Sequence, residues 1–195
     1  MKSLFGEYYK IILYTILGLM IIMSSYIIIL NIHHYHAISL EVAVSDIDSE
    51  YKSYIDNVLK IEDNIDKVKD SDLVLGLNKT IDIMKNSGVF RLIPKTKLSY
   101  RDLYELNDYF LEKLVNDGWV KYIKPHYLNT NYDDDINILI NNAKYLNKTL
   151  NDNGLIMYDV KNDRKIIDEY HFILKNYEMF SKVILNISNI GGDNG

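Results

Sequence analysis

The chain opens with an unbroken apolar run at residues 11–30. Twelve of these twenty residues are Ile or Leu, and none carries a charge. At about 1.5 Å per helical residue, such a run crosses a hydrocarbon core of about 30 Å. Tyr8 and Tyr35 flank it, and aromatic rings favour the headgroup level of a membrane. The pattern predicts one transmembrane helix in a lipid bilayer.

Two other interpretations of this run are a cleaved signal peptide and a buried core helix. The apolar region of a signal peptide is usually 7–15 residues long and ends at a small-residue cleavage site. This run is longer, and residues 31–39 (NIHHYHAIS) offer no such site. A core helix normally keeps a polar face. We therefore interpret the run as an uncleaved signal-anchor.

The orientation of the helix follows from the positions of Lys and Arg. Lys2 and Lys10 precede the run, whereas residues 31–50 contain neither Lys nor Arg. The positive-inside rule places residues 1–10 in the cytoplasm as a short tail and residues 31–195 outside it. We expect a single-pass protein of the cell (inner or plasma) membrane with an extracytoplasmic C-terminal domain.

A second apolar pattern follows at residues 31–71, and its residues recur at alternating spacings of four and three. We call them the seam: Leu40, Val44, Ile47, Tyr51, Tyr54, Val58, Ile61, Ile65 and Val68. A strict 3.5-residue period keeps one stripe facing a partner helix. The pattern predicts a juxtamembrane segment and coiled-coil stalk that pairs in a homo- or hetero-oligomer. A helix that packs on its own domain remains the alternative.

Residues 72–188 show shorter patterns that predict a helix-rich distal domain. We expect a helix over 73–84, one from 103 that ends at Asp117-Gly118, one over 136–150 and one over 163–188. Short strands are expected at 89–93, 119–124 and 155–160, and a disordered tail at 189–195. The predicted fold class is mainly α: one transmembrane helix, a coiled-coil-like stalk helix, and a small helical or α+β distal domain.

Composition and charge exclude several classes of function. The chain has no Cys, which excludes disulfides, thiolate metal sites and Cys nucleophiles. Residues 1–10 carry +1 of the total of −5, so residues 31–195 carry −6, which disfavours a nucleic-acid partner. Residues 111–123 (LEKLVNDGWVKYI) loosely resemble the helix-into-wing segment of winged-helix domains. The charge and the predicted topology both disfavour that interpretation.

Candidate chemistry is sparse. His33, His34 and His36 suit either a metal ion at the membrane surface or, as we favour, a polar collar. Residues 131–137 (NYDDDIN) lack the Gly and Glu of a calcium loop and are better explained as acids at a helix start. The sequence contains no GxSxG, HExxH or phosphate-loop motif. We therefore assign no catalytic, cofactor or metal residue and do not expect an enzyme.

The order of parts is a short tail, a membrane helix, a stalk and a distal domain. That order is similar to the inner-membrane subunits of type II secretion and type IV pilus machines, as a likeness of topology without a shared motif. We expect a membrane-anchored interaction or structural protein, a subunit of a membrane-associated assembly that pairs through its stalk. The alternative is a membrane-tethered enzyme or ligand-binding protein with a site in the distal domain.

Overall fold

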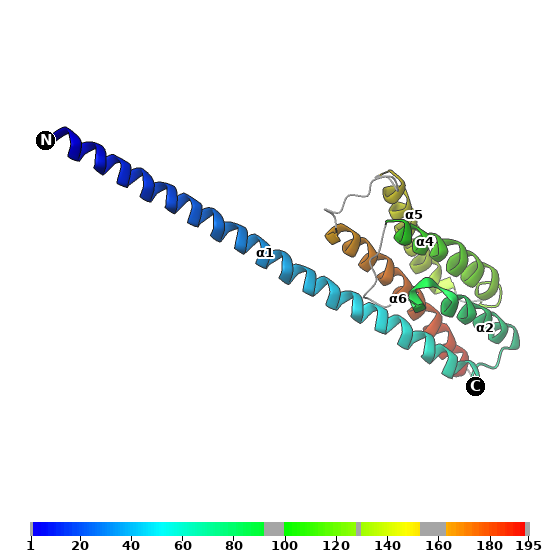
Figure 1. Ribbon diagram of the computed structural model, residues 1–195. Helices are drawn as coiled ribbons and strands as arrows, with labels where there is room; N and C mark the ends of the chain where they lie inside the picture. The colour runs from blue at the N-terminus through cyan, green and yellow to red at the C-terminus, as the bar shows by residue number, and fades with distance from the viewer. Residues whose placement is uncertain (1, 92–99, 128–129, 153–162, 194–195) are drawn as a thin grey trace. The chain divides into compact units, whose positions relative to one another are not determined.

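The computed structural model describes residues 2–91, 100–127, 130–152 and 163–193, and every regular element in these ranges is helical (Figure 1). The elements are α1 (Lys2–Ile65), α2 (Ser71–Asn86), α3 (Gly88–Arg91), α4 (Tyr100–Tyr109), the π-helix η1 (Phe110–Ile123), the 3-10 helix η2 (Thr130–Tyr132), α5 (Asp133–Asp152) and α6 (Asp163–Asp193). The chain divides into two compact units, Met1–Val42 and Ala43–Gly195. We call the second unit the helical domain.

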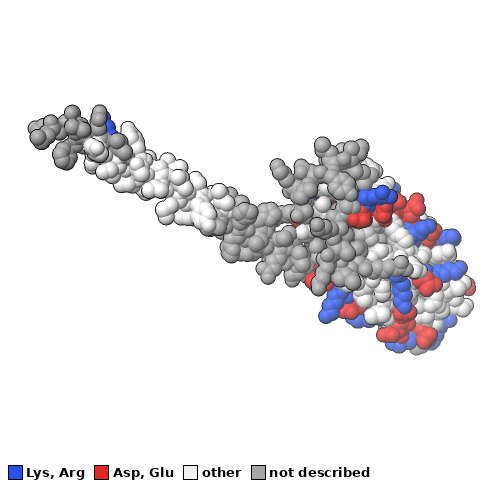
Figure 2. All heavy atoms as spheres, viewed as in Figure 1, with Lys and Arg blue, Asp and Glu red and all other residues white. Residues whose placement is uncertain are grey.

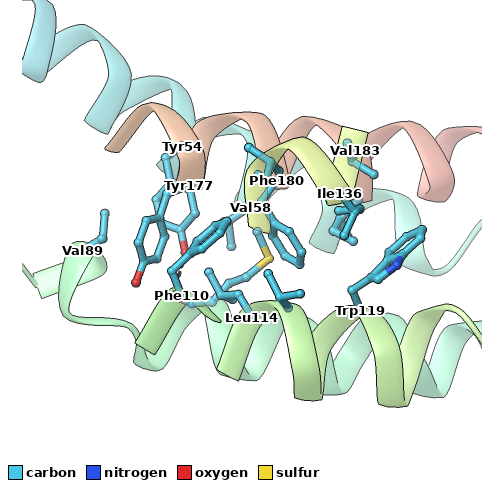
Figure 3. Close-up of a cluster of buried hydrophobic side chains, with 14 of the residues drawn as sticks. Tyr54, Val58, Val89, Phe110, Leu114, Trp119, Ile136, Tyr177, Phe180 and Val183 are labelled. Atoms are coloured by element: carbon cyan, nitrogen blue, oxygen red, sulfur yellow. Dashed lines mark hydrogen bonds between the residues drawn. The ribbon is translucent and has the colours of Figure 1, made fainter. Parts of the chain in front are cut away.

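The helical domain has one core, to which α1, α2, α4, η1, α5 and α6 all contribute apolar side chains. Its centre is aromatic (Figure 3). The rings of Tyr54 and Tyr177 meet edge to face at 5.5 Å between centroids, and Phe110 lies 5.2 Å from Tyr177 and 6.0 Å from Phe180. Such edge and tilted contacts add about 0.5–1.5 kcal/mol beyond the area they bury. The domain is thus a helical bundle that the final part of α1 completes.

The last part of α1 and the helix α6 run parallel, side by side (Figure 1). Three hydrogen-bonded pairs join them: Ser53 Oγ to Glu178 Oε1 at 2.9 Å, Asn57 Nδ2 to Ser181 Oγ at 3.0 Å, and Asn64 Nδ2 to Asn189 Oδ1 at 2.6 Å. The partners are 125, 124 and 125 residues apart in sequence. This nearly constant separation means that the two helices advance in the same direction and in register.

Helices α2 and η1 approach each other very closely, at glycines. A Cβ placed on Gly76 would lie 2.3 Å from the backbone oxygen of Tyr122. One turn further along α2, the Thr80 hydroxyl donates to the Gly118 carbonyl at 3.2 Å. The 2.3 Å distance requires a residue without a side chain at position 76, because a Cβ there would meet a backbone atom, which cannot move aside.

The boundaries of several helices agree with the sequence. Helix α2 starts where Asp70 Oδ1 accepts the backbone N–H groups of Asp72 and Leu73, as an N-cap does. It ends before Ser87-Gly88, two residues beyond the predicted helix over 73–84. Helix α5 begins at the predicted acidic run, and α6 begins at Asp163. Helix α6 continues to Asp193, into the tail that we expected to be disordered.

Two strand predictions and one helix end were wrong. Residues 88–91 form α3 instead of a strand, and residues 119–123 continue η1. Trp119 and Ile123 are both buried, and their four-residue spacing places them on one face of a helix. The strand prediction depended instead on alternating apolar and polar residues in this stretch. Gly118 does not end the helix, because it lies at the contact with Thr80. The third predicted strand, residues 155–160, lies outside the described residues.

The close approach of α2 and η1 predicts the effect of Gly76→Ala. The added methyl group forces the two helices apart, so we expect a loss of about 1–3 kcal/mol of stability, as overpacking typically costs. Trp119, the single tryptophan of the chain, is buried in η1 and reports on unfolding of this domain. Asn78→Ala, at an exposed position of the same helix, is the control. Equal midpoints for the two variants would contradict the close contact.

Candidate functional site

The first candidate site is the apolar segment at Tyr8–Ile29 within α1. In the part of the chain that the structure describes, it is the one helix long and apolar enough to cross a membrane. None of its most apolar window is buried, and large side chains such as Ile22 and Met23 are more than half exposed. Apart from Lys10 near its start, the segment consists of uncharged residues, and Figure 2 shows most of it as a white stretch. In water such a surface is unfavourable at about 25 cal/mol per Å², whereas in lipid it is solvated.

One polar side chain within this segment forms a hydrogen bond inside its own helix. Ser25 Oγ donates to the Ile21 carbonyl at 2.9 Å, one turn back along the same helix. A hydroxyl bonded to its own helix exposes no unpaired donor to hydrocarbon. Helical hydrogen bonds satisfy the backbone in the same way. The length and composition of the segment are therefore compatible with a lipid environment.

The second candidate site is the seam, and the structure places its described part inside the core of the helical domain. Ile47, Tyr54, Val58, Ile61, Ile65 and Val68 are buried there, and Tyr51 is half-buried against the same core. The side chains of Leu40 and Val44 lie outside the described residues. Other helices of the same domain cover this stripe. The self-packing alternative is thus what the structure shows for residues 47–68, and the coiled-coil stalk is not confirmed.

Tyr54 is the seam residue with both ring contacts and hydrogen bonds inside the helical domain. Its ring is fully buried beside Tyr177, and its hydroxyl donates to the Met84 carbonyl at 3.0 Å, with Ser87 Oγ 3.3 Å away. Burial raises the pKa of this hydroxyl far above its usual range. The unusual tyrosine at a seam position thus has a partner for its polar end inside the domain. Figure 3 shows it pointing into the same cluster as Val58 and Phe110.

The third candidate site is a group of charged side chains where α1 meets α6. Glu50 Oε2 lies 2.9 Å from His171 Nδ1, and both atoms are buried without a hydrogen bond of good geometry among the described residues. Burial raises the pKa of the Glu50 carboxyl, and His171 beside it acts in the opposite direction. Glu178 nearby accepts from Ser53 and, at 2.6 Å, from Lys182.

Glu169 is a fourth, separate acidic group on α6. Its Oε2 atom is buried and unpaired within the described residues, and Lys165 reaches only to 3.8 Å from Oε1. Burial raises the pKa of this carboxyl, while Lys165 lowers it and Asp168 raises it. The folded domain therefore disfavours the ionised form of Glu169.

No arrangement for metal binding occurs among the residues that the structure describes, since no three His, Asp or Glu side chains converge there. The side chains of His33, His34 and His36 lie outside that set, so the polar collar stays a prediction. Asp133, at the start of α5, pairs with Lys124 at 3.0 Å. That pairing agrees with acids that cap and position a helix start.

The polar pairs between α1 and α6 have no direct sign in the pattern of apolar and polar residues. Asn57 and Ser181 look like ordinary surface residues in a one-dimensional pattern, yet both are buried and bonded to each other. Of the two residues, Asn57 alone has a position that suggests burial, because it lies directly before the seam residue Val58.

Comparison with known proteins adds no relative: no family model, curated protein or solved structure matches the chain.

The placement of the seam predicts the outcome of Val58→Asp. A carboxylate in this fully buried position has no partner, so we expect the helical domain to lose at least about 3 kcal/mol or to unfold. The control is Leu59→Asp, because the neighbouring side chain is 45% exposed and should tolerate the charge. Trp119 emission and amide hydrogen exchange measure both. A folded Val58→Asp variant that merely loses self-association would show that the seam is an interface between chains.

The environment of Glu169 predicts an unusual dependence on pH. A carboxyl whose folded pKa is raised contributes stability at low pH, and that contribution is lost as the pH rises through the folded pKa. We expect the midpoint temperature of unfolding to decrease as the pH is raised from 5 to 8. Glu169→Gln should flatten this slope and raise the midpoint at pH 8 by about 2 °C. Glu112→Gln, at an exposed position, should change neither. A midpoint that Glu169→Gln lowers at pH 8 would contradict this account.

Proposed function

We propose that the chain is a single-pass membrane-anchored interaction protein, in which the apolar segment anchors the helical domain to a membrane. The observation that carries the proposal is the exposure of Tyr8–Ile29, which has no core of its own to cover it. At about 1.5 Å per residue its 22 residues reach about 33 Å, enough for a hydrocarbon core. Lipid is the environment that makes this surface favourable.

The proposed orientation has the N-terminus in the cytoplasm and the helical domain outside it. Lys2 and Lys10 lie on the N-terminal side, and the first twenty residues after the apolar run contain no Lys or Arg. Retention of positive charge on the cytoplasmic side then sets the direction of insertion.

The proposed partner is another protein, in a homo- or hetero-oligomer of a membrane-associated assembly. Pairing through seam residues 47–68 would require them to leave their own core, so we assign the contact to the surface of the helical domain. On α5, the described side chains of Ile138 and Tyr145 are 52% and 72% exposed and seven residues apart, which puts them on one face. Apolar groups on one exposed face suit a protein contact.

The absence of cysteine allows a clean topology experiment. Ser3→Cys and Asn141→Cys each introduce a single thiol, one on either side of the apolar segment. In intact cells or spheroplasts, a membrane-impermeant maleimide should label Asn141→Cys, and should label Ser3→Cys only after the membrane is permeabilised. The cysteine-free chain is the blank. Equal labelling of both thiols, or recovery of a mature chain that starts beyond residue 30, would contradict the anchor.

The interaction is tested separately by crosslinking in the membranes of the native host. We expect adducts larger than the 22.8 kDa chain. The double variant Ile138→Asp with Tyr145→Asp should lose these adducts, whereas Asn78→Asp, at an exposed position of α2, should retain them. Adducts that survive the double variant would place the contact elsewhere, and a chain that stays monomeric would remove the interaction itself.

A further inference from the structure

Charged residues gather where α1 and α6 first meet in the helical domain. Glu50 and His171 form a charged pair across this contact, with side chains 13% and 36% exposed. Their facing atoms, Oε2 and Nδ1, are both shielded from solvent and 2.9 Å apart. The next contact along the helices is the hydrogen bond from Ser53 to Glu178. The pair thus precedes the three hydrogen-bonded pairs along α1.

The charges around the pair are unbalanced when its imidazole is neutral. Asp46 on α1 and Glu178 on α6 both act on Glu50, so three carboxylates share this region. Lys175 acts on Glu50, and Lys182 pairs with Glu178 at 2.6 Å. Three negative and two positive charges leave a net charge of −1. One added proton brings the group to neutrality.

We propose that the contact of Glu50 with His171 is a proton-operated latch between α1 and α6. Uptake of one proton from solvent by the imidazole turns the 2.9 Å contact of Nδ1 with Oε2 from one with a neutral ring into an ion pair. The paired state holds the start of α6 more tightly to α1. Loss of the proton leaves a shielded carboxylate beside a neutral ring and loosens the same contact.

The physical basis is the cost of an unpaired shielded charge. Glu50 is largely removed from water, and an ionised group there requires a hydrogen-bonding or charged partner. Histidine is the side chain whose ordinary pKa lies between pH 5 and pH 8, so that is the range over which the latch is tested. The conclusion concerns the helical domain alone and does not depend on the proposed membrane function.

The test is a double-mutant cycle of Glu50→Gln and His171→Gln in the full-length chain in detergent, read by Trp119 emission at pH 6 and pH 8. At pH 6 we expect each single variant to lower the unfolding midpoint by about 3 °C, with strong coupling between the two positions. At pH 8 the coupling should vanish. Glu169 also makes the domain pH-dependent, so coupling is the relevant quantity, not the slope alone. His126→Gln, an exposed histidine outside this contact, is the matched control.

His171→Lys provides a second variant with a permanent charge. It should raise the midpoint at pH 8 and remove the coupling's dependence on pH. Hydrogen exchange at the start of α6 should slow on acidification in the wild-type chain and not in His171→Gln. Coupling of the same size at both pH values, or an unchanged response in His171→Gln, would overturn the latch.

Discussion

The burial of one stripe of α1 against the rest of the helical domain is the interaction on which this fold depends. Val58 and Ile61 are fully buried there, and Tyr54 meets the aromatic centre of the core. Without this stripe, the apolar faces of α2 and α6 would lack a covering helix. Burying a large apolar side chain contributes about 1.5–3 kcal/mol, so a few such residues match the whole net stability of a typical domain. The last part of α1 is therefore a structural part of the domain.

This constraint also explains why α1 carries two different apolar patterns. At residues 11–30 the apolar side chains surround the helix, which suits a helix whose whole surface meets one apolar solvent. At residues 47–65 they form one stripe, and the other faces hold charged residues such as Asp48, Asp56 and Asp63. The polar contacts between α1 and α6 then select a register within that apolar contact. Asn57 donates to Ser181 inside the core, so a sliding of either helix would leave the buried Asn57 amide without this partner.

Much of the fold was predictable from local patterns. The start of α2 at Asp70 and its end before Ser87-Gly88 follow from capping and breaking residues, which act over one or two turns. The acidic start of α5 is local in the same sense. Gly118 was misleading because a glycine that permits a close helix contact looks the same in sequence as one that ends a helix. The nature of the contact depends on Thr80, 38 residues away, which no local pattern contains.

The candidate site was less predictable for a related reason. A heptad stripe is equally suited to a partner chain and to a neighbouring helix of the same chain, since both bury the same face. Only the presence of α6, about 125 residues later and parallel to α1, decides between them. The pairing of Glu50 with His171 has the same origin, because neither residue belongs to a recognisable motif. The apolar segment at Tyr8–Ile29 needed no such information, since its signal is its own length and composition.

The central claim is that the seam of α1 packs inside its own domain, and an oxidative crosslink across α1 and α6 tests it most directly. The chain has no native cysteine. Of the three hydrogen-bonded pairs between α1 and α6, Asn64 and Asn189 form the most exposed, with Nδ2 2.6 Å from Oδ1. With cysteines at both positions, this account predicts a disulfide within one chain, which a non-reducing gel shows as a compact monomer. Disulfides formed solely between two chains, with no intramolecular product, would contradict it.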